Sequence, residues 1–175
     1  AEGAFNAAFV PAYARIREQG GPERAGLFAD RIFTILLASQ IVLLVLALIF
    51  TPTVIDVLAP GFSSDPVRYA LAVDLTRITF PYLLLITVVT FYGGMLNALQ
   101  RFAAAAAAPI LLNLSLIVAL LVAIYFPTPG HAAAWGVLVS GVLQALLVGG
   151  DAFRAKVLAR LRRPRLDADI RQFFR

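Results

Sequence analysis

The chain has 175 residues, of which 61% are hydrophobic and only 14% are charged, and its formal net charge is +5. This composition excludes an ordinary soluble domain, and the absence of cysteine excludes a disulfide framework and thiolate metal sites. Because the basic residues flank the apolar stretches and form no separate basic region, the positive charge indicates a membrane protein and not a nucleic-acid-binding one.

Four stretches of the chain carry almost no charge. Each is long enough to cross the roughly 30 Å hydrocarbon core of a bilayer, which takes about 20 apolar residues in a helix. The four stretches are 32–50, 78–100, 102–130 and 132–150. They predict an all-α fold, a polytopic transmembrane helix bundle that forms a single transmembrane region over residues 1–175. Four complete spans are expected, with partial helices at both ends.

The first elements are separated by glycine and proline. Residues 1–18 predict the end of a helix, and a turn is expected at the paired glycines before Pro22. The first span is expected over 22–58, from Pro22 at a first helical position to the Ala-Pro-Gly sequence that ends at Gly61. The chain therefore begins with a helix end, a turn and a long span.

Three further spans follow. The second is expected over 66–100, where Asp65 caps the helix and Pro81 removes a backbone hydrogen bond, which predicts a kink. The third is expected over 102–126 and the fourth over 131–150.

Residues 151–175 form a basic segment with apolar side chains on one side. This pattern predicts an amphipathic cytoplasmic segment that lies on an anionic leaflet, and its last part, 166–175, is typical of a capped helix start. Thirteen of the 15 Lys and Arg lie in 1–31, at Arg101 or in 154–175. The positive-inside rule then places both ends of the chain in the cytoplasm, which agrees with an even number of spans.

Five segments stand in an order and spacing that suggest a family. They are AEGAFNAAFVP at 1–11, APGF at 59–62, ITFPYLLL at 78–85, GGMLNALQRF at 93–102 and AAPILLN at 107–113. In this combination the chain resembles the MurJ/MviN family of lipid II flippases, in the MOP exporter superfamily, over essentially all 175 residues. The resemblance implies an internal fragment of the N-terminal lobe of a MATE/MOP-like fourteen-helix fold.

The resemblance also implies a function. Members of the family flip lipid II, the undecaprenyl-pyrophosphate-linked peptidoglycan precursor, across the bacterial cytoplasmic (inner) membrane by alternating access, for cell-wall synthesis. The expected partners are lipid II or a similar polyprenyl-pyrophosphate-linked glycan, anionic phospholipids, and the remaining helices of the parent protein. No cofactor, metal, catalytic residue or nucleic acid is expected.

Six residues are candidates for the substrate path or gate: Glu2, Gly3, Asn6, Asn97, Arg101 and Asn113. The resemblance implies that Glu2 and Gly3, in the EGA motif, lie near a gate, although Glu2 could also be a solvated acid near the chain end. A carboxylate at membrane depth is costly enough to indicate function. Asn97 and Arg101 end the second span, where Arg101 is either an interfacial anchor or a contact for a lipid phosphate or a gate partner. Asn113 suits a hydrogen bond between helices or a contact with substrate.

Other classes of membrane protein remain to be compared. An enzyme acting on lipid phosphates needs paired carboxylates, histidines or metal ligands near the interface, and residues 75–150 contain no acidic residue. The chain is therefore expected not to be an enzyme. Another MOP-type flippase, for a different lipid-linked oligosaccharide, and a non-transporting membrane scaffold remain alternatives. A transporter helix is expected to show one polar face, which a scaffold does not need.

Overall fold

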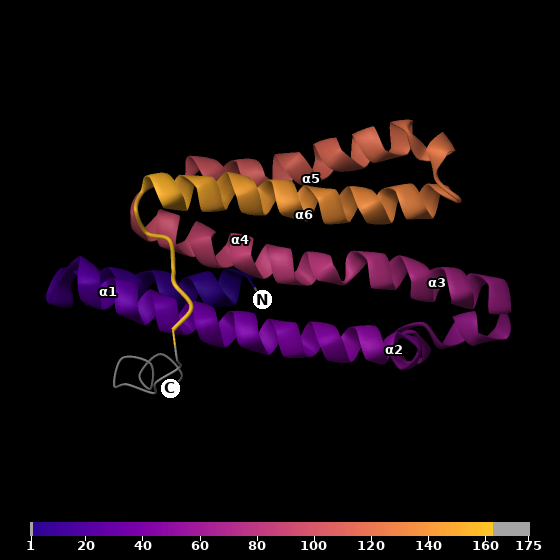
Figure 1. Ribbon diagram of the computed structural model, residues 1–175, viewed down its shortest axis with the longest axis horizontal. Coiled ribbons are helices and arrows are strands. Elements are labelled where there is room, and N and C mark those ends of the chain that lie inside the picture. The colour runs from indigo at the N-terminus through magenta and orange to yellow at the C-terminus, as the bar shows by residue number, and fades with distance from the viewer. Residues whose placement is uncertain (1, 163–175) are drawn as a thin grey trace. The chain divides into compact units, whose positions relative to one another are not determined.

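The computed structural model describes residues 2–162, which contain helices and no strand (Figure 1). Four helical stretches in this range are long and apolar enough to cross a membrane: Phe5–Ile49, Pro66–Ala98, Ala103–Leu121 and Pro129–Arg154. They confirm the predicted all-α fold and its four spanning helices. The elements are α1 (Glu2–Ile49), α2 (Thr51–Leu58), the 3-10 helix η1 (Pro60–Ser64), α3 (Pro66–Thr79), α4 (Pro81–Ala98), α5 (Ala103–Leu121), the 3-10 helix η2 (Ala123–Tyr125) and α6 (Pro129–Arg154).

The chain divides into two compact units. Among the described residues, the first unit contains 2–39, 87–108 and 145–162, and the second contains 40–86 and 109–144. Every candidate residue of the path or gate except Asn113 belongs to the first unit.

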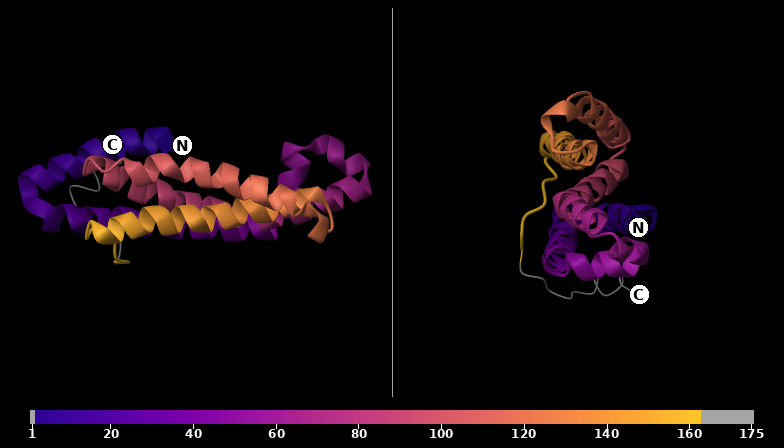
Figure 2. Two further views of the ribbon diagram at one scale, coloured as in Figure 1. Left: turned by 90° about the horizontal axis from the view of Figure 1, so that it is seen from above. Right: turned by 90° about the vertical axis from the view of Figure 1, so that its right-hand side faces the viewer.

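Gly21 divides α1 into two limbs. Its backbone angles, φ 76° and ψ 174°, are open essentially to glycine alone, and the following Pro22 disfavours a helical residue before it. The chain turns back at this point, so that the two limbs run side by side (Figure 2). The rings of Phe9 and Phe28 stack between the limbs with their centroids 6.0 Å apart.

An aromatic cluster holds α4 against both limbs of α1. Phe9 is fully buried, and the centroid of its ring lies 5.3 Å from that of Phe91 in α4. From the second limb, the ring of Phe33 lies 5.0 Å from that of Phe91. Such aromatic pairs contribute about 0.5–1.5 kcal/mol each beyond the burial of their area. They therefore fix the part of α4 that carries Asn97.

In the second unit, α2 and α3 are joined by polar contacts. Asp65 caps α3, since its carboxylate accepts hydrogen bonds from the backbone N–H groups of Val67 at 3.1 Å and Arg68 at 3.2 Å. The hydroxyl of Tyr69 donates to the carbonyl of Pro52 at 3.1 Å. This bond ties the first turn of α3 to the first turn of α2.

Pro81 marks the boundary between α3 and α4. It has no N–H group, so the backbone hydrogen bond that a continuous helix would have at this position is missing. The bonds on either side are present, from Phe80 N–H to the Thr76 carbonyl and from Leu83 N–H to the Phe80 carbonyl, both 2.9 Å. The boundary between the two helices therefore falls at Pro81, the position where the sequence predicts a kink.

Small residues bring α5 and α6 together in the second unit. A Cβ added to Gly136 would lie 2.7 Å from the Cβ of Ala119 and 3.3 Å from the carbonyl oxygen of Ser115. No larger residue fits at position 136 without movement of α5. The close approach is the kind that glycine permits between membrane helices.

The chain leaves α6 in the first unit. After α6 ends at Arg154, Lys156 adopts a left-handed conformation with φ 59°, which commonly ends a helix. Residues 157–162 are irregular and run from α6 to α1, as the yellow part of the chain in Figure 1 shows. The basic segment is thus helical only as far as Arg154 among the described residues. The helix start predicted at 166–175 lies outside them.

Candidate functional site

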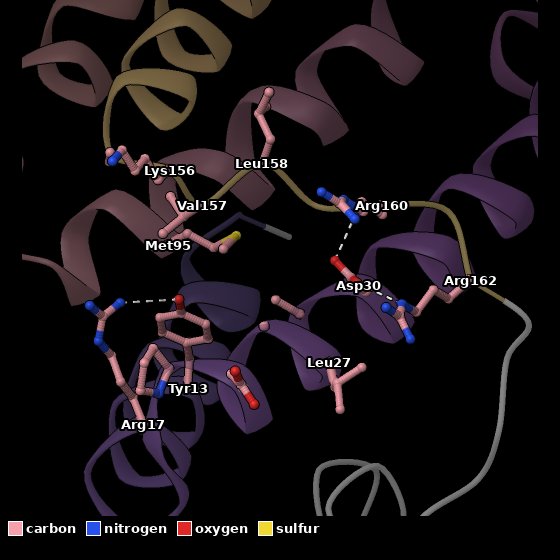
Figure 3. A pocket seen from close by; sticks show the side chains of 15 residues that line it. Tyr13, Arg17, Leu27, Asp30, Met95, Lys156, Val157, Leu158, Arg160 and Arg162 are labelled. Carbon is pink, nitrogen blue, oxygen red and sulfur yellow. Dashed lines mark hydrogen bonds and ion pairs between the residues drawn. The ribbon is translucent and has the colours of Figure 1, made fainter.

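A pocket of about 870 Å³ lies in the first unit, and we call it the basic pocket (Figure 3). Both limbs of α1, the end of α4 and the chain after α6 contribute to its walls. Its ionisable side chains are those of Arg17, Glu23, Asp30, Lys156, Arg160 and Arg162, and apolar parts of its wall come from Leu27, Met95 and Leu158.

Asp30 ties the 157–162 segment to α1. Its Oδ1 accepts a hydrogen bond from the backbone N–H of Arg160 at 2.8 Å, and its Oδ2 lies 3.2 Å from Nε of Arg162. One turn further along α1, the hydroxyl of Thr34 accepts from the backbone N–H of Arg162 at 3.1 Å. Two N–H groups are thus satisfied by side chains of α1, which gives the segment hydrogen bonds that a continued helix would otherwise supply. Asp30 is only 8% exposed, so water competes little for these contacts.

The basic pocket keeps an excess of positive charge after the pair between Asp30 and Arg162 is set aside. Arg17 donates to the hydroxyl of Tyr13 at 3.4 Å, a neutral partner that does not compensate its charge. In the described part of the chain, neither Arg17 nor Lys156 nor Arg160 forms an ion pair. Glu23 is the one acidic side chain of the wall beyond Asp30. The arrangement is suited to attract an anion.

A second cluster surrounds the predicted candidate Arg101. Its Nε donates to Oδ2 of Asp151 at 3.4 Å, and its Nη2 donates to Oδ1 of the same carboxylate. The hydrogen bond and the negative charge of Asp151 raise the pKa of the Arg101 guanidinium, which therefore stays protonated. The pair borders a pocket of about 760 Å³ to which Arg154 also contributes. Arg101 thus has a partner within the chain, Asp151, which the sequence interpretations did not name.

Asn6 packs against Gly94. A Cβ added to Gly94 would lie 2.7 Å from Oδ1 of Asn6 and 3.3 Å from the ring of Phe9, so glycine is needed for this approach. The Oδ1 atom of Asn6 is buried and accepts no hydrogen bond from the described residues. A buried unpaired acceptor costs about 1–3 kcal/mol, so its presence calls for a functional explanation.

The other candidates lie in different surroundings. Gly3 is exposed, with open space where a Cβ would stand, and Asn97 is partly exposed on the last turn of α4. Asn113 is exposed in the second unit and donates to the carbonyl of Pro109 in its own helix at 3.3 Å. The side chain of Glu2 lies outside the described part of the structure. Among the described side chains of the first unit, no contact joins Asn6, Asn97 and Arg101 to one another.

Two polar side chains in the middle of α6 are buried. Ser140 and Gln144, one helical turn apart, are 0% and 2% exposed, and Nε2 of Gln144 donates to the hydroxyl of Ser140 at 3.4 Å. The Ser140 hydroxyl in turn donates to the carbonyl of Val137 at 2.6 Å. These hydrogen bonds satisfy the pair within its own helix, so it forms part of the packing of α6.

Sequence reasoning missed two acidic residues, Asp30 and Asp151, which hold the two clusters together. Asp30 stands just before the apolar stretch 32–50, and Asp151 directly follows the stretch 132–150. At such boundaries most charged residues are basic, so an acid there indicates a cationic partner. Their positions at the edges of apolar stretches are the signal that could have identified them.

Comparison with known proteins gives a consistent result. The family model described as "Lipid II flippase MurJ" matches residues 1–175. The chain is 39% identical to the probable lipid II flippase MurJ of Rhizobium tropici and 36% identical to that of Rhizobium meliloti (strain 1021), with 98% of this chain and 33% of each relative covered. It is 40% identical to the lipid II flippase MurJ of Burkholderia cenocepacia, with 84% of this chain and 29% of the relative covered. The chain thus spans about a third of the length of these relatives.

Proposed function

Because this chain belongs to the lipid II flippase MurJ family, we propose that it takes part in moving lipid II across the bacterial cytoplasmic membrane. The observation that carries the proposal is the match of the family model over residues 1–175. The family is one of transporters and not of enzymes. The four apolar helices agree with a function inside a membrane.

A path for lipid II needs polar walls. The substrate carries a charged pyrophosphate and a sugar, and neither crosses the hydrocarbon core without a hydrophilic cavity. The described spans hold few polar side chains, and the pair of Ser140 and Gln144 is used within α6. We expect further helices of the parent protein to supply most of the cavity, which opens alternately to the two sides of the membrane.

The orientation of the chain follows from its charges. Apart from Arg68 and Arg77, all Lys and Arg fall in sequence ranges assigned to the first unit. By the positive-inside rule, the Gly21 turn of α1 and the C-terminal ends of α4 and α6, which carry the basic pocket and the Arg101–Asp151 pair, face the cytoplasm. The Gly21 turn between the two limbs of α1 and the 157–162 segment then lie on the cytoplasmic side.

The gate of the proposed path includes Glu2, Gly3 and Asn6. The unpaired buried oxygen of Asn6 supports this role, because it can accept a hydrogen bond from a substrate or from a helix that moves during transport. The exposure of Gly3 leaves room for such an approach. Asn97, Arg101 and Asn113 are proposed as secondary contacts along the path.

Complementation in cells depleted of their own lipid II flippase tests the function and the gate separately. The protein, expressed from its complete reading frame, is expected to restore growth and to move labelled lipid II in vesicles made from those cells. Glu2→Gln, at an equal protein level, is expected to reduce both, whereas the matched control Arg15→Gln is expected to behave as the parent. Full activity of Glu2→Gln overturns the gate. Failure of the parent protein with lipid II, or transport of a different lipid-linked oligosaccharide alone, overturns the function.

A further inference from the structure

We propose that the basic pocket of the first unit binds the phosphate headgroup of an anionic phospholipid. The headgroup is held by Arg17 from the first limb of α1 and by Lys156 and Arg160 from the chain after α6. This site is distinct from the proposed gate, which lies at Glu2, Gly3 and Asn6, none of which lines the pocket.

The charges of the pocket call for an anion. Three basic side chains of its wall form no ion pair within the described residues, and Glu23 alone opposes them once Asp30 is paired with Arg162. Figure 3 shows Arg17 and Lys156 on one side of the pocket and Arg160 on the other, so the cations surround the space between them. Such an arrangement allows charge-assisted hydrogen bonds to the oxygens of one phosphate from several directions.

The pocket is also preorganised. The backbone N–H of Arg160 is fixed by Asp30 at 2.8 Å, and that of Arg162 is fixed by Thr34 at 3.1 Å. These bonds hold the 157–162 segment across α1 before any ligand arrives. A site whose segments are ordered in advance binds more tightly, because less conformational entropy is lost on binding.

Apolar neighbours identify a lipid as the source of the phosphate. Leu27 and Leu158 line the same pocket and are 37% and 45% exposed. Leu161, which lies in the chain between the pocket residues Arg160 and Arg162, is 69% exposed. The apolar stretch of α1 begins at Ile32, two positions after Asp30, so the pocket stands where a span leaves the hydrocarbon core. A free phosphate makes no use of these apolar side chains, whereas the glycerol and the first methylene groups of a phospholipid cover them. The volume of about 870 Å³ is of the size that accepts a headgroup together with the start of its chains.

Native mass spectrometry can measure the retained lipid directly. The protein, expressed from its complete reading frame and purified in mild detergent, is titrated with phosphatidylglycerol or with phosphatidylcholine. The pocket variant is Arg17→Gln/Arg160→Gln, which keeps the backbone bond between Arg160 and Asp30. The matched control is Arg15→Gln/Arg77→Gln, which removes the same charge at two exposed positions outside the pocket. The unfolding temperature of each variant is measured in phosphatidylcholine, so that loss of folding is separated from loss of binding.

The parent and the control variant are expected to retain phosphatidylglycerol in preference to phosphatidylcholine. Each cation near an anionic headgroup contributes about a fivefold gain in affinity, so the pocket variant is expected to bind phosphatidylglycerol about 30-fold more weakly at an unchanged unfolding temperature. Equal binding by the pocket variant, or equal losses in the two variants, overturns the site. Displacement of the lipid by inorganic phosphate or glycerol phosphate assigns the pocket to a free anion, and displacement by lipid II assigns it to the transported substrate. Either result overturns the phospholipid site.

Discussion

The guanidinium of Arg101 and the carboxylate of Asp151, 50 positions apart, form an ion pair that joins the connection after α4 to the last turn of α6. The two side chains are 45% and 19% exposed, so the pair is partly screened by water. Arg101 is the one basic residue between the apolar stretches 78–100 and 102–130, and the ion pair holds its side chain against α6. Arg101 is thereby kept from extending freely toward the lipid headgroups.

Removal of either member of this pair is expected to weaken the same contact. Arg101→Gln and Asp151→Asn should each lower the unfolding temperature in detergent by roughly 2–4 °C. The unfolding temperature of the double variant should be no lower than that of the less stable single variant. Arg154→Gln, at an exposed neighbour that forms no ion pair with the described residues, is the control and should have no effect. Additive losses in the double variant would show that the two residues act independently.

The contact of α5 with α6 depends on the lack of a side chain at position 136. Gly136→Ala is expected to destabilise the protein by about 1–3 kcal/mol, because the new Cβ would lie 2.7 Å from that of Ala119. Ala119→Gly in the same chain should restore part of the loss, since the Ser115 carbonyl remains close. Gly149→Ala, where a Cβ meets nothing within 4 Å, is the control and should be neutral or stabilising. Denaturation in detergent gives all four values, and equal losses for the two alanine variants would contradict the packing.

Substitution of Asn6, whose Oδ1 has no partner among the described residues, can distinguish a role in folding from a role in transport. Asn6→Ala removes a buried acceptor that has no partner among the described residues, so the substitution is expected not to lower the stability of the protein. Growth in the complementation assay should nevertheless fall if this oxygen belongs to the gate. Normal growth at a normal protein level would leave Asn6 as a packing residue beside Gly94.

The attachment of the 157–162 segment to α1 can be tested by hydrogen exchange. Asp30→Ala removes the acceptor of the Arg160 N–H, which should then exchange at least about tenfold faster, and the segment should become sensitive to proteolysis. Thr34→Val removes only the bond to the N–H of Arg162 and should leave the exchange at Arg160 near that of the parent. Unchanged protection at Arg160 in Asp30→Ala would show that other contacts hold the segment.

The topology can be mapped by cysteine labelling, since the chain has no cysteine of its own. With an impermeant thiol reagent on intact cells, Ser63→Cys and His131→Cys should be labelled, and Arg160→Cys should not. This outcome follows from the distribution of Lys and Arg along the chain. The opposite pattern, with label at position 160 and none at 63, would invert the proposed orientation.

Features set by a few neighbouring residues could be predicted from the sequence. The four spans follow from the length of the apolar stretches, because a helix must cover the hydrocarbon core. The boundary at Pro81 and the left-handed Gly21 before Pro22 follow from local steric rules. Each of these signals acts over a few residues, so no knowledge of the tertiary fold is needed.

Features that depend on distant parts of the chain could not be predicted in this way. Residues 157–162 are not helical, and two of their N–H groups are bound by Asp30 and Thr34, which precede them by 130 and 128 positions. The pairing of Arg101 with Asp151 and the burial of the Asn6 oxygen likewise depend on which helices meet. Single-sequence patterns show which residues are polar, and the fold decides which of them become partners.

The bond between Asp30 and Arg160 has a consequence for biosynthesis. A bacterial ribosome adds about 5–20 residues per second, so the 130 positions between these residues correspond to roughly 7–26 s of elongation. Throughout that interval the carboxylate of Asp30 has already been made while its partner has not. This contact therefore forms late in the folding of the nascent chain, after α1 to α6 have been translated. It can form only when α1 and the segment that follows α6 have packed together.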